Sequence, residues 1–446
     1  MRSKDSDPSL HLRPMDASTV TGAFAAALLA SLVVKLWLAT RQMRHVASHR
    51  LRVPAAFAGH VTLEAHTKAA DYTLAKGRFG LIALSFGAAG LLAWTLLGGL
   101  DLLNTTLLEA VLPRWGTMAY QLALLASFVV IGALIELPLN WYATFRLEQR
   151  FGFNRMTPRL WLADMLRGAA VGAVIGLPLA ALILWIMASS GGLWWLWAWG
   201  AWVVFNLVLM VLYPTVIAPL FNKFEPLPDE ALKARVQALM KRCGFAVKGL
   251  FVMDGSKRSA HSNAYFTGLG AAKRVVFFDT LLQRLSPLEV EAVLAHELGH
   301  FKHKHVLKRI VAIFALSLAG LALLGWLSGQ SSFYLGLGAA PNLAAPNDAL
   351  ALILFMLVLP PFTFFMGPVM AHFSRRDEFQ ADAYACAQAD GRALASALLK
   401  LHEDNAATLT PDPLYVRFYY SHPPASERLA ALPTSVSSAP ATPAAA

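Results

Sequence analysis

The sequence predicts an all-α membrane protein that crosses the bilayer seven times and carries a small α+β domain outside it. Of its 446 residues, 57% are hydrophobic and only 15% are charged, and the mean hydropathy is +0.50. This composition is too apolar for an ordinary soluble protein of the same length. Seven apolar stretches are long enough to cross the hydrocarbon as helices, and one mixed, charged segment interrupts them.

The predicted spans have the length that a helix needs to cross a bilayer, about 20 residues. They lie at residues 18–40, 79–100, 118–140, 169–189, 193–217, 306–328 and 348–372. Only Gly191 and Gly192 separate the fourth span from the fifth, so these two could instead form one hairpin that does not cross completely. The first span is longer than a signal peptide core and no cleavage site follows it, which indicates an uncleaved signal anchor.

The basic residues of the loops predict how the spans are oriented. Residues 41–78 contain seven Lys or Arg against two acidic residues, and residues 141–168 contain five Arg. Residues 101–117 contain one basic residue and residues 329–347 contain none. Because cytoplasmic loops are enriched in Lys and Arg, we expect the N-terminus outside and the C-terminus in the cytosol. The net charge of +11 then reflects this asymmetry and contact with anionic lipid, not nucleic-acid binding.

The domain organisation follows from these spans. We expect an N-terminal tail, five spans with cytosolic loops, a cytosolic insert, two further spans, a cytosolic C-terminal part and a low-complexity, disordered tail, at residues 1–17, 18–217, 218–305, 306–372, 373–432 and 433–446. Cys243 and Cys386 are the only cysteines, and both fall on the predicted cytosolic side. They argue against a disulfide framework or a four-cysteine metal site, and no motif around them indicates another role.

The cytosolic insert contains the pattern H-E-x-x-H at residues 296–300. Residues four apart project from the same face of a helix, so His296 and His300 can present two imidazole nitrogens to one Zn²⁺. Glu297 then stands beside the metal as a general base for water. Ser286 and Glu289 form a predicted capping box with Pro287 between them, which supports a helix over this segment.

The rest of the insert predicts elements that could hold an extended peptide near this helix. Asp229 caps a predicted helix that ends at Gly244, and two β-type runs follow at residues 249–253 and 274–278. An edge strand beside a metal helix could bind a peptide by strand addition. Between the two runs, residues 261–266 offer polar side chains that could bond a peptide backbone, although Ser and Asn are also common in turns.

A catalytic zinc needs a third protein ligand, for which Glu378 is the best candidate. The seventh span continues as a helix past the membrane, and Glu378 and Asp382 lie four apart on one of its faces. Glu378 can therefore bind the metal while Asp382 accepts a hydrogen bond from a ligand imidazole. His303 and His305 compete as ligands, but their spacing from His300 does not match a known zinc protease, so we interpret them as interfacial basic residues.

Together these motifs resemble the type I CAAX prenyl endopeptidases, a family of integral-membrane zinc metalloproteases. The resemblance covers about residues 51–432. It rests on His-Ser-Asn-Ala-Tyr-Phe at 261–266, His-Glu-Leu-Gly-His at 296–300, Ser-Arg-Arg-Asp-Glu-Phe-Gln-Ala-Asp at 374–382 and Ser-His-Pro-Pro at 421–424, with Phe-Gly-Phe-Asn at 151–154 and the segments at 213–214 and 224–227 in support. It implies a ring of seven tilted helices around a water-filled chamber that a zincin-type domain closes on the cytosolic side.

The resemblance also implies roles for single residues. His296, His300 and Glu378 would bind one zinc ion per chain and Glu297 would activate water. Asn263 would bond the substrate backbone and His422 would stabilise the oxyanion. Arg428 would support the site from behind. From the residues alone, His422 lies in a rigid turn that could aim its imidazole, and a surface histidine in a turn would look the same.

The expected function is a membrane-embedded zinc metalloendopeptidase that cleaves a peptide or protein substrate, lipidated or not, at the cytosolic face of the membrane. The Ala-, Leu- and Arg-rich composition indicates a bacterial inner-membrane protein. Prenylated substrates are not expected in bacteria. The role could therefore be either C-terminal processing of the CAAX type or membrane protein quality control. We expect a monomer. A transporter, channel or scaffold with a structural metal is the alternative, which the few charged residues within the spans disfavour.

Overall fold

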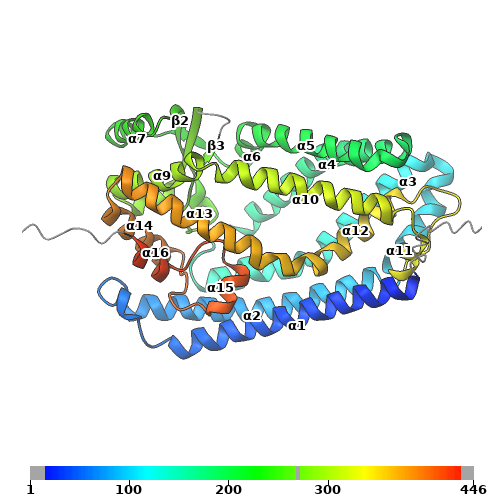
Figure 1. Ribbon diagram of the computed structural model, residues 1–446, viewed down its shortest axis with the longest axis horizontal. Coiled ribbons are helices and arrows are strands. Elements are labelled where there is room, and N and C mark those ends of the chain that lie inside the picture. Colours follow the sequence, from blue (N-terminus) through cyan, green and yellow to red (C-terminus); the bar gives the residue numbers. More distant parts are fainter. Residues whose placement is uncertain (1–15, 268–271, 433–446) are drawn as a thin grey trace, which may run out of the picture.

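The computed structural model describes residues 16–267 and 272–432. The expected tails at 1–17 and 433–446 therefore lie almost wholly outside the described residues. In Figure 1 the long helices run along the longest axis, and the strands gather at one end with α7, α9 and α14. The two largest apolar cores lie among the membrane helices and in the domain at that end.

The prediction of seven spans is confirmed, because seven described helices or runs of helices are long and apolar enough to cross a membrane. The first five such stretches are built from α1 (Ala17–His49), α2 (Leu63–Trp94), α3 (Gly99–Tyr142), α4 (Pro158–Ser189) and α5 (Trp194–Leu212). The last two are α10 (His305–Leu327) and the run formed by α12 (Asp348–Thr363) and α13 (Gly367–Gln388). The helical stretches on either side of Gly191 are each long and apolar enough to cross a membrane, which favours two spans over one incomplete hairpin.

Two of these helices depart from regular geometry. Gly116 has φ 77° inside α3, so the helix bends sharply there and its first part is a separate helix where we expected a loop. π-helical turns follow α3 at Ala143–Glu148 and α5 at Tyr213–Ile217, and the second contains Pro214. Proline removes a backbone donor, which is a common cause of such irregular turns. The short helices α6 (Ala218–Phe221) and α11 (Ser331–Gly336) lie in connections.

The domain outside the spans has a four-stranded sheet, where the sequence predicted only two β runs. The strands are β1 (Phe224–Pro226), β2 (Ala246–Met253), β3 (Ala264–Thr267) and β4 (Ala272–Phe278), in the order β1-β2-β4-β3. Strands β2 and β4 are the predicted runs and pair in parallel, whereas β3 pairs antiparallel to β4 at the edge. The prediction missed β3 because Ser262 and Asn263, which favour turns, directly precede it.

Helices α7 (Glu230–Arg242), α8 (Asp279–Arg284), α14 (Gly391–Asp404), α15 (Pro413–Tyr419) and α16 (Ala425–Ala431) complete the described chain around α9 (Pro287–Lys302). The capping box of α9 is confirmed: Ser286 Oγ accepts from the Glu289 N–H and Glu289 Oε2 accepts from the Ser286 N–H. The buried Glu289 carboxylate also accepts from Ser396 Oγ and pairs with Lys400 Nζ at 2.8 Å, both on α14. The cap therefore fixes both where α9 begins and how it packs on α14.

Helices α9 and α13 approach each other unusually closely at Gly299, and Figure 1 shows them side by side. A Cβ added at Gly299 would lie 2.9 Å from Ala381 Cα and 3.2 Å from Ala381 O, and both of these are backbone atoms. Since a backbone cannot give way as a flexible side chain can, only glycine allows this separation of the two helices.

We expect Gly299→Ala to force α9 and α13 apart, with a loss of about 1 to 3 kcal/mol in the free energy of unfolding. Gly320→Ala is the matched control, because nothing lies within 4 Å of a Cβ added at this position in α10. The midpoint of thermal unfolding in detergent checks both variants. Equal midpoints for the two would contradict the close approach as a packing constraint.

Candidate metal centre

Helix α9 presents the two histidines of the H-E-x-x-H pattern on one face, as the spacing predicts. The Nε2 atoms of His296 and His300 lie 3.2 Å apart and the two rings are nearly perpendicular, at 84°. His296 is buried against α13 and His300 is partly exposed. The two nitrogens therefore point at one shared position.

Helix α13 supplies the third candidate ligand to the same position. Glu378 is 3% exposed, and its Oε2 lies 3.4 Å from His296 Nε2 while its Oε1 lies 3.4 Å from His300 Nε2. One ligand atom from each of the three residues can lie within 4.8 Å of the others, which makes them a group that could hold a metal ion. The acidic residue predicted from the sequence and the two histidines are thus brought together.

Asp382 and Arg428 hold His296 from behind. The Nδ1–H of His296 donates to Asp382 Oδ1 at 2.9 Å, so its Nε2 carries the free lone pair. Arg428 donates to both oxygens of Asp382, at 2.9 Å from Nε and 2.6 Å from Nη2, and its Nη1 lies 3.6 Å from Glu378 Oε2. Asp382 and Arg428 are both buried, so this ion pair fixes the tautomer and the orientation of the ring.

His305 holds His300 in the corresponding way, which makes our interpretation of it as an interfacial residue wrong. It is 1% exposed. Its Nε2 lies 2.9 Å from Gln380 Oε1 and 3.4 Å from Asp377 Oδ1, both of which accept, so Nε2 bears the proton. Its Nδ1 then accepts from His300 Nδ1–H at 3.1 Å, which leaves the lone pair of His300 on Nε2. No sequence spacing reveals this, because it depends on how α13 packs across the start of α10.

The residues fit a tetrahedral metal ion. Zinc bound to N and O ligands at about 2.0 to 2.1 Å separates neighbouring ligand atoms by about 3.3 to 3.4 Å, close to the distances observed. Two nitrogen lone pairs and a carboxylate face each other, and Glu378 Oε2 is buried without a hydrogen-bond partner among the described residues. Burial opposes a positive His296, yet Asp382 and Glu378 raise the pKa of its imidazole to about 9. The carboxylates around the two imidazoles therefore favour a positive charge at the position that their Nε2 atoms share.

Glu297 follows His296 on α9 and is half-buried. Burial raises the pKa of its carboxyl group, an effect that the neighbouring His296 and His300 oppose. A carboxylate with a raised pKa is a stronger base at neutral pH than one in water. Its placement beside both candidate histidine ligands suits proton transfer with a water at the metal position.

The other two predicted residues differ in their placement. His422 precedes α16 and lies with its Nε2 3.3 Å from Glu378 Oε1, with its side chain 63% exposed. It therefore reaches the metal position from the open side. Asn263 lies at the start of the edge strand β3, exposed, and its Oδ1 accepts from the Ala264 N–H. The structure thus brings His422 to the ligands, whereas Asn263 lies one residue before β3 and its side chain bonds the backbone of its own segment.

Two family models match the chain in sequence. Residues 42–223 match the CAAX prenyl protease N-terminal family, described as five membrane helices, and residues 226–436 match peptidase family M48. The chain belongs to the M48 family of CAAX prenyl proteases. It is a membrane metalloendopeptidase, and the alternative of a transporter, channel or scaffold is not favoured. The resemblance and the fold class predicted from the sequence are confirmed.

Named relatives and a solved structure agree with this family. The chain is 34% identical to CAAX prenyl protease 1 of Saccharomyces cerevisiae over 89% of its length and 91% of that protein. It is 33% identical to the CAAX prenyl protease 1 homolog of Homo sapiens, over 92% and 95%. The crystal structure of S. mikatae Ste24p is similar with a TM-score of 0.86 and 32% identity, over 94% of this chain and 100% of that one.

We expect His305→Ala to weaken metal binding by about 10- to 100-fold, because His300 loses the acceptor that fixes its ring. His303→Ala is the control, since His303 is exposed and its ring makes aromatic contacts with His305 and Tyr384, at 5.5 Å and 6.1 Å, but no hydrogen bond to a candidate ligand is observed among the described residues. Competition with a chelator of known affinity measures the metal affinity of both purified variants. An affinity in His305→Ala equal to that in His303→Ala would exclude the positioning role.

Proposed function

We propose that the chain binds one Zn²⁺ through His296, His300 and Glu378 and hydrolyses peptide bonds near the cytosolic face of the membrane. The observation that carries the proposal is the group of three residues in which the two Nε2 atoms lie 3.2 Å apart and each lies 3.4 Å from one oxygen of Glu378, with both imidazoles held by buried partners. When bound, zinc lowers the pKa of a coordinated water and polarises the substrate carbonyl. His296, His300 and Glu378 would supply three protein ligands, the number typical of a catalytic zinc site.

The chain's own residues divide the remaining work. Glu297 takes the proton of the attacking water and passes it to the leaving amine. His422, at the open side of Glu378, faces the negative charge that develops on the carbonyl oxygen. Asn263 and the free edge of β3 hold the substrate backbone in an extended form, as strand addition requires. Asp382 and Arg428 act through His296 and do not contact the substrate.

For the substrate we propose C-terminal segments of membrane-associated proteins, lipidated or not. The names of the yeast and human relatives support processing of the CAAX type over general quality control. The residues of the proposed site all come from one chain, which supports a monomer as the working unit. The basic loops support a cytosolic site, and the composition supports a bacterial inner membrane as the location.

We expect Glu297→Gln to keep its zinc and lose peptidase activity by about 10²- to 10⁴-fold, because the ligands remain and the base is gone. Glu378→Ala should lose both zinc and activity. Elemental analysis and cleavage of a quenched fluorescent peptide measure the two variants beside the wild type. Retained turnover in Glu297→Gln, or full zinc occupancy in Glu378→Ala, would contradict the assigned roles.

The orientation can be tested separately. A cysteine introduced at Ala344, an exposed position between α11 and α12, should react with an impermeant reagent added outside intact cells. A cysteine introduced at Lys257, in the protease domain, should react only after the cells are opened. Both substitutions belong in a chain whose Cys243 and Cys386 have been replaced by Ser. Labelling in the opposite order would reverse the topology.

A further inference from the structure

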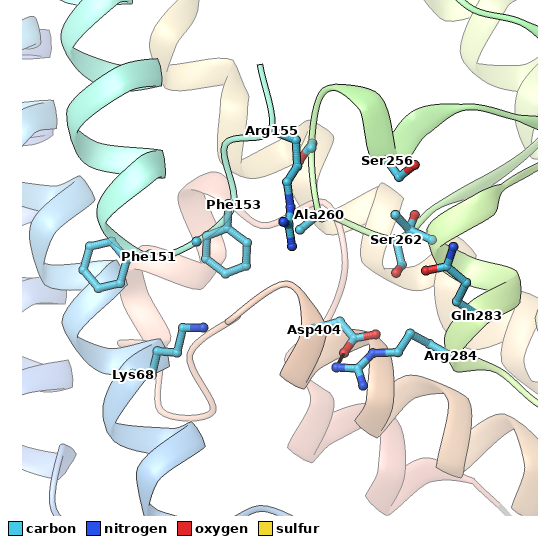
Figure 2. A pocket seen from close by; sticks show the side chains of 13 residues that line it. Lys68, Phe151, Phe153, Arg155, Ser256, Ala260, Ser262, Gln283, Arg284 and Asp404 are labelled. Atoms are coloured by element: carbon cyan, nitrogen blue, oxygen red, sulfur yellow. Dashed lines mark ion pairs between the residues drawn. The ribbon is translucent and has the colours of Figure 1, made fainter. Parts of the chain in front are cut away.

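A basic cavity lies where the membrane part of the chain meets the protease domain. It has a volume of about 550 Å³, within the range of small-ligand sites. Its walls come from the first turns of α2, the segment 151–155 after α3, the segments 256 and 259–262 between β2 and β3, and the ends of α8 and α14. Figure 2 shows these five parts of the chain around it.

Three cationic side chains and one carboxylate line this cavity. Figure 2 shows Lys68 and Arg155 pointing into the space from opposite walls, while Arg284 pairs with Asp404. The Arg284–Asp404 pair has an N–O distance of 2.5 Å, so that carboxylate is already used. Within the described residues, Lys68 and Arg155 form no ion pair. The side chains that line the cavity therefore carry a net charge of about +2.

The walls that carry these cations are held firmly. The Lys68 ammonium lies 5.3 Å from the centre of the Phe153 ring, and that ring stacks on His261 with centroids 4.4 Å apart. The Arg155 N–H donates to Arg258 O, and the Ala260 N–H donates to Phe153 O. The backbone that positions Arg155 is thus bonded to the segment that leads into β3.

The cavity lies at the N-terminal end of the free edge strand. Ser262 lines it, and β3 begins two residues later at Ala264. A peptide that adds to β3 in the antiparallel sense, the more stable ladder, has its C-terminal side at this end. Because an extended chain advances about 3.3 Å per residue, a peptide that leaves β3 at Ala264 reaches the cavity wall at Ser262 within about two residues.

We propose that this cavity binds the terminal carboxylate of the substrate, with Lys68 and Arg155 as its partners. The inference rests on the proposed peptidase function and deepens it. A carboxylate held here selects substrates whose cleaved bond lies a short distance from the C-terminus, because only their end can reach both cations. Internal bonds of long chains would place neutral backbone in the cavity instead.

The test compares two quenched fluorescent peptides of one sequence, one with a free C-terminal carboxylate and one with a C-terminal amide. The wild-type enzyme should cleave the acid with a kcat/KM about tenfold above that of the amide, the size expected for partly exposed charge-assisted hydrogen bonds. Lys68→Gln and Arg155→Gln should each reduce this ratio towards one by slowing only the acid. Lys257→Gln and Arg159→Gln, exposed cations outside the cavity wall, should keep the wild-type ratio.

The outcomes separate this inference from the function on which it rests. If the wild type cleaves both peptides equally, the carboxylate site is excluded and the peptidase function stands. If it cleaves neither, the peptidase function fails, and with it the inference. A lipid phosphate is the other anion that these cations could bind. An activity that rises with phosphatidylglycerol in the wild type but not in Arg155→Gln, with an acid-to-amide ratio of one, would assign the cavity to lipid and overturn the proposal.

Discussion

The candidate site depends on the contact between α9 and α13, two helices that come from distant parts of the chain. Two of the three candidate ligands are on α9 and the third is on α13, so the distance between the helix axes sets the distance between ligand atoms. Gly299 permits the approach because its neighbour is the backbone of Ala381. Gly299 lies directly before His300. A change in helix separation would therefore act directly on the 3.4 Å distance between His300 Nε2 and Glu378 Oε1.

Each imidazole has its own buried partner, and the two partners differ in charge. Asp382, paired with Arg428, is an ionic acceptor for His296, whereas His305 is a neutral acceptor for His300. A second carboxylate behind His300 would add negative charge to a place that already holds Glu378 and Asp382. The neutral acceptor fixes the ring without that repulsion. Gln380, Asp377 and Asp382 all lie on α13. This helix therefore supplies the ligand Glu378 and also the residues that hold His296 directly and His300 through His305.

The sequence predicted those features whose cause is local. Span length follows from hydropathy, the start of α9 from its capping box, and the pairing of His296 with His300 from a spacing of four. Glu378 was predicted because the same spacing placed it with Asp382 on a helix after the last span. The burial of His305 was not predictable, because Gln380 and Asp377 meet it only through tertiary packing. Strand β3 was missed for a related reason: its four residues are stabilised by pairing with β4, not by a pattern of their own.

The segment that leads into β3 is also held by the membrane part of the chain. His261, three residues before β3, bonds Asn405 Oδ1 through its Nδ1. His261 Nε2 also lies 3.8 Å from Glu148 Oε2. The other oxygen of this carboxylate, Oε1, accepts from the hydroxyl of Tyr72 on α2. Arg258 pairs with Asp164 on α4 at 2.8 Å. Both contacts join the segment before β3 to parts of the membrane helices that lie near the protease domain. The position of β3 is therefore set jointly by the protease core and by the membrane helices. The metal ligands are joined to the membrane part as well, because α13 continues the seventh span and His305, which holds His300, is the first residue of α10.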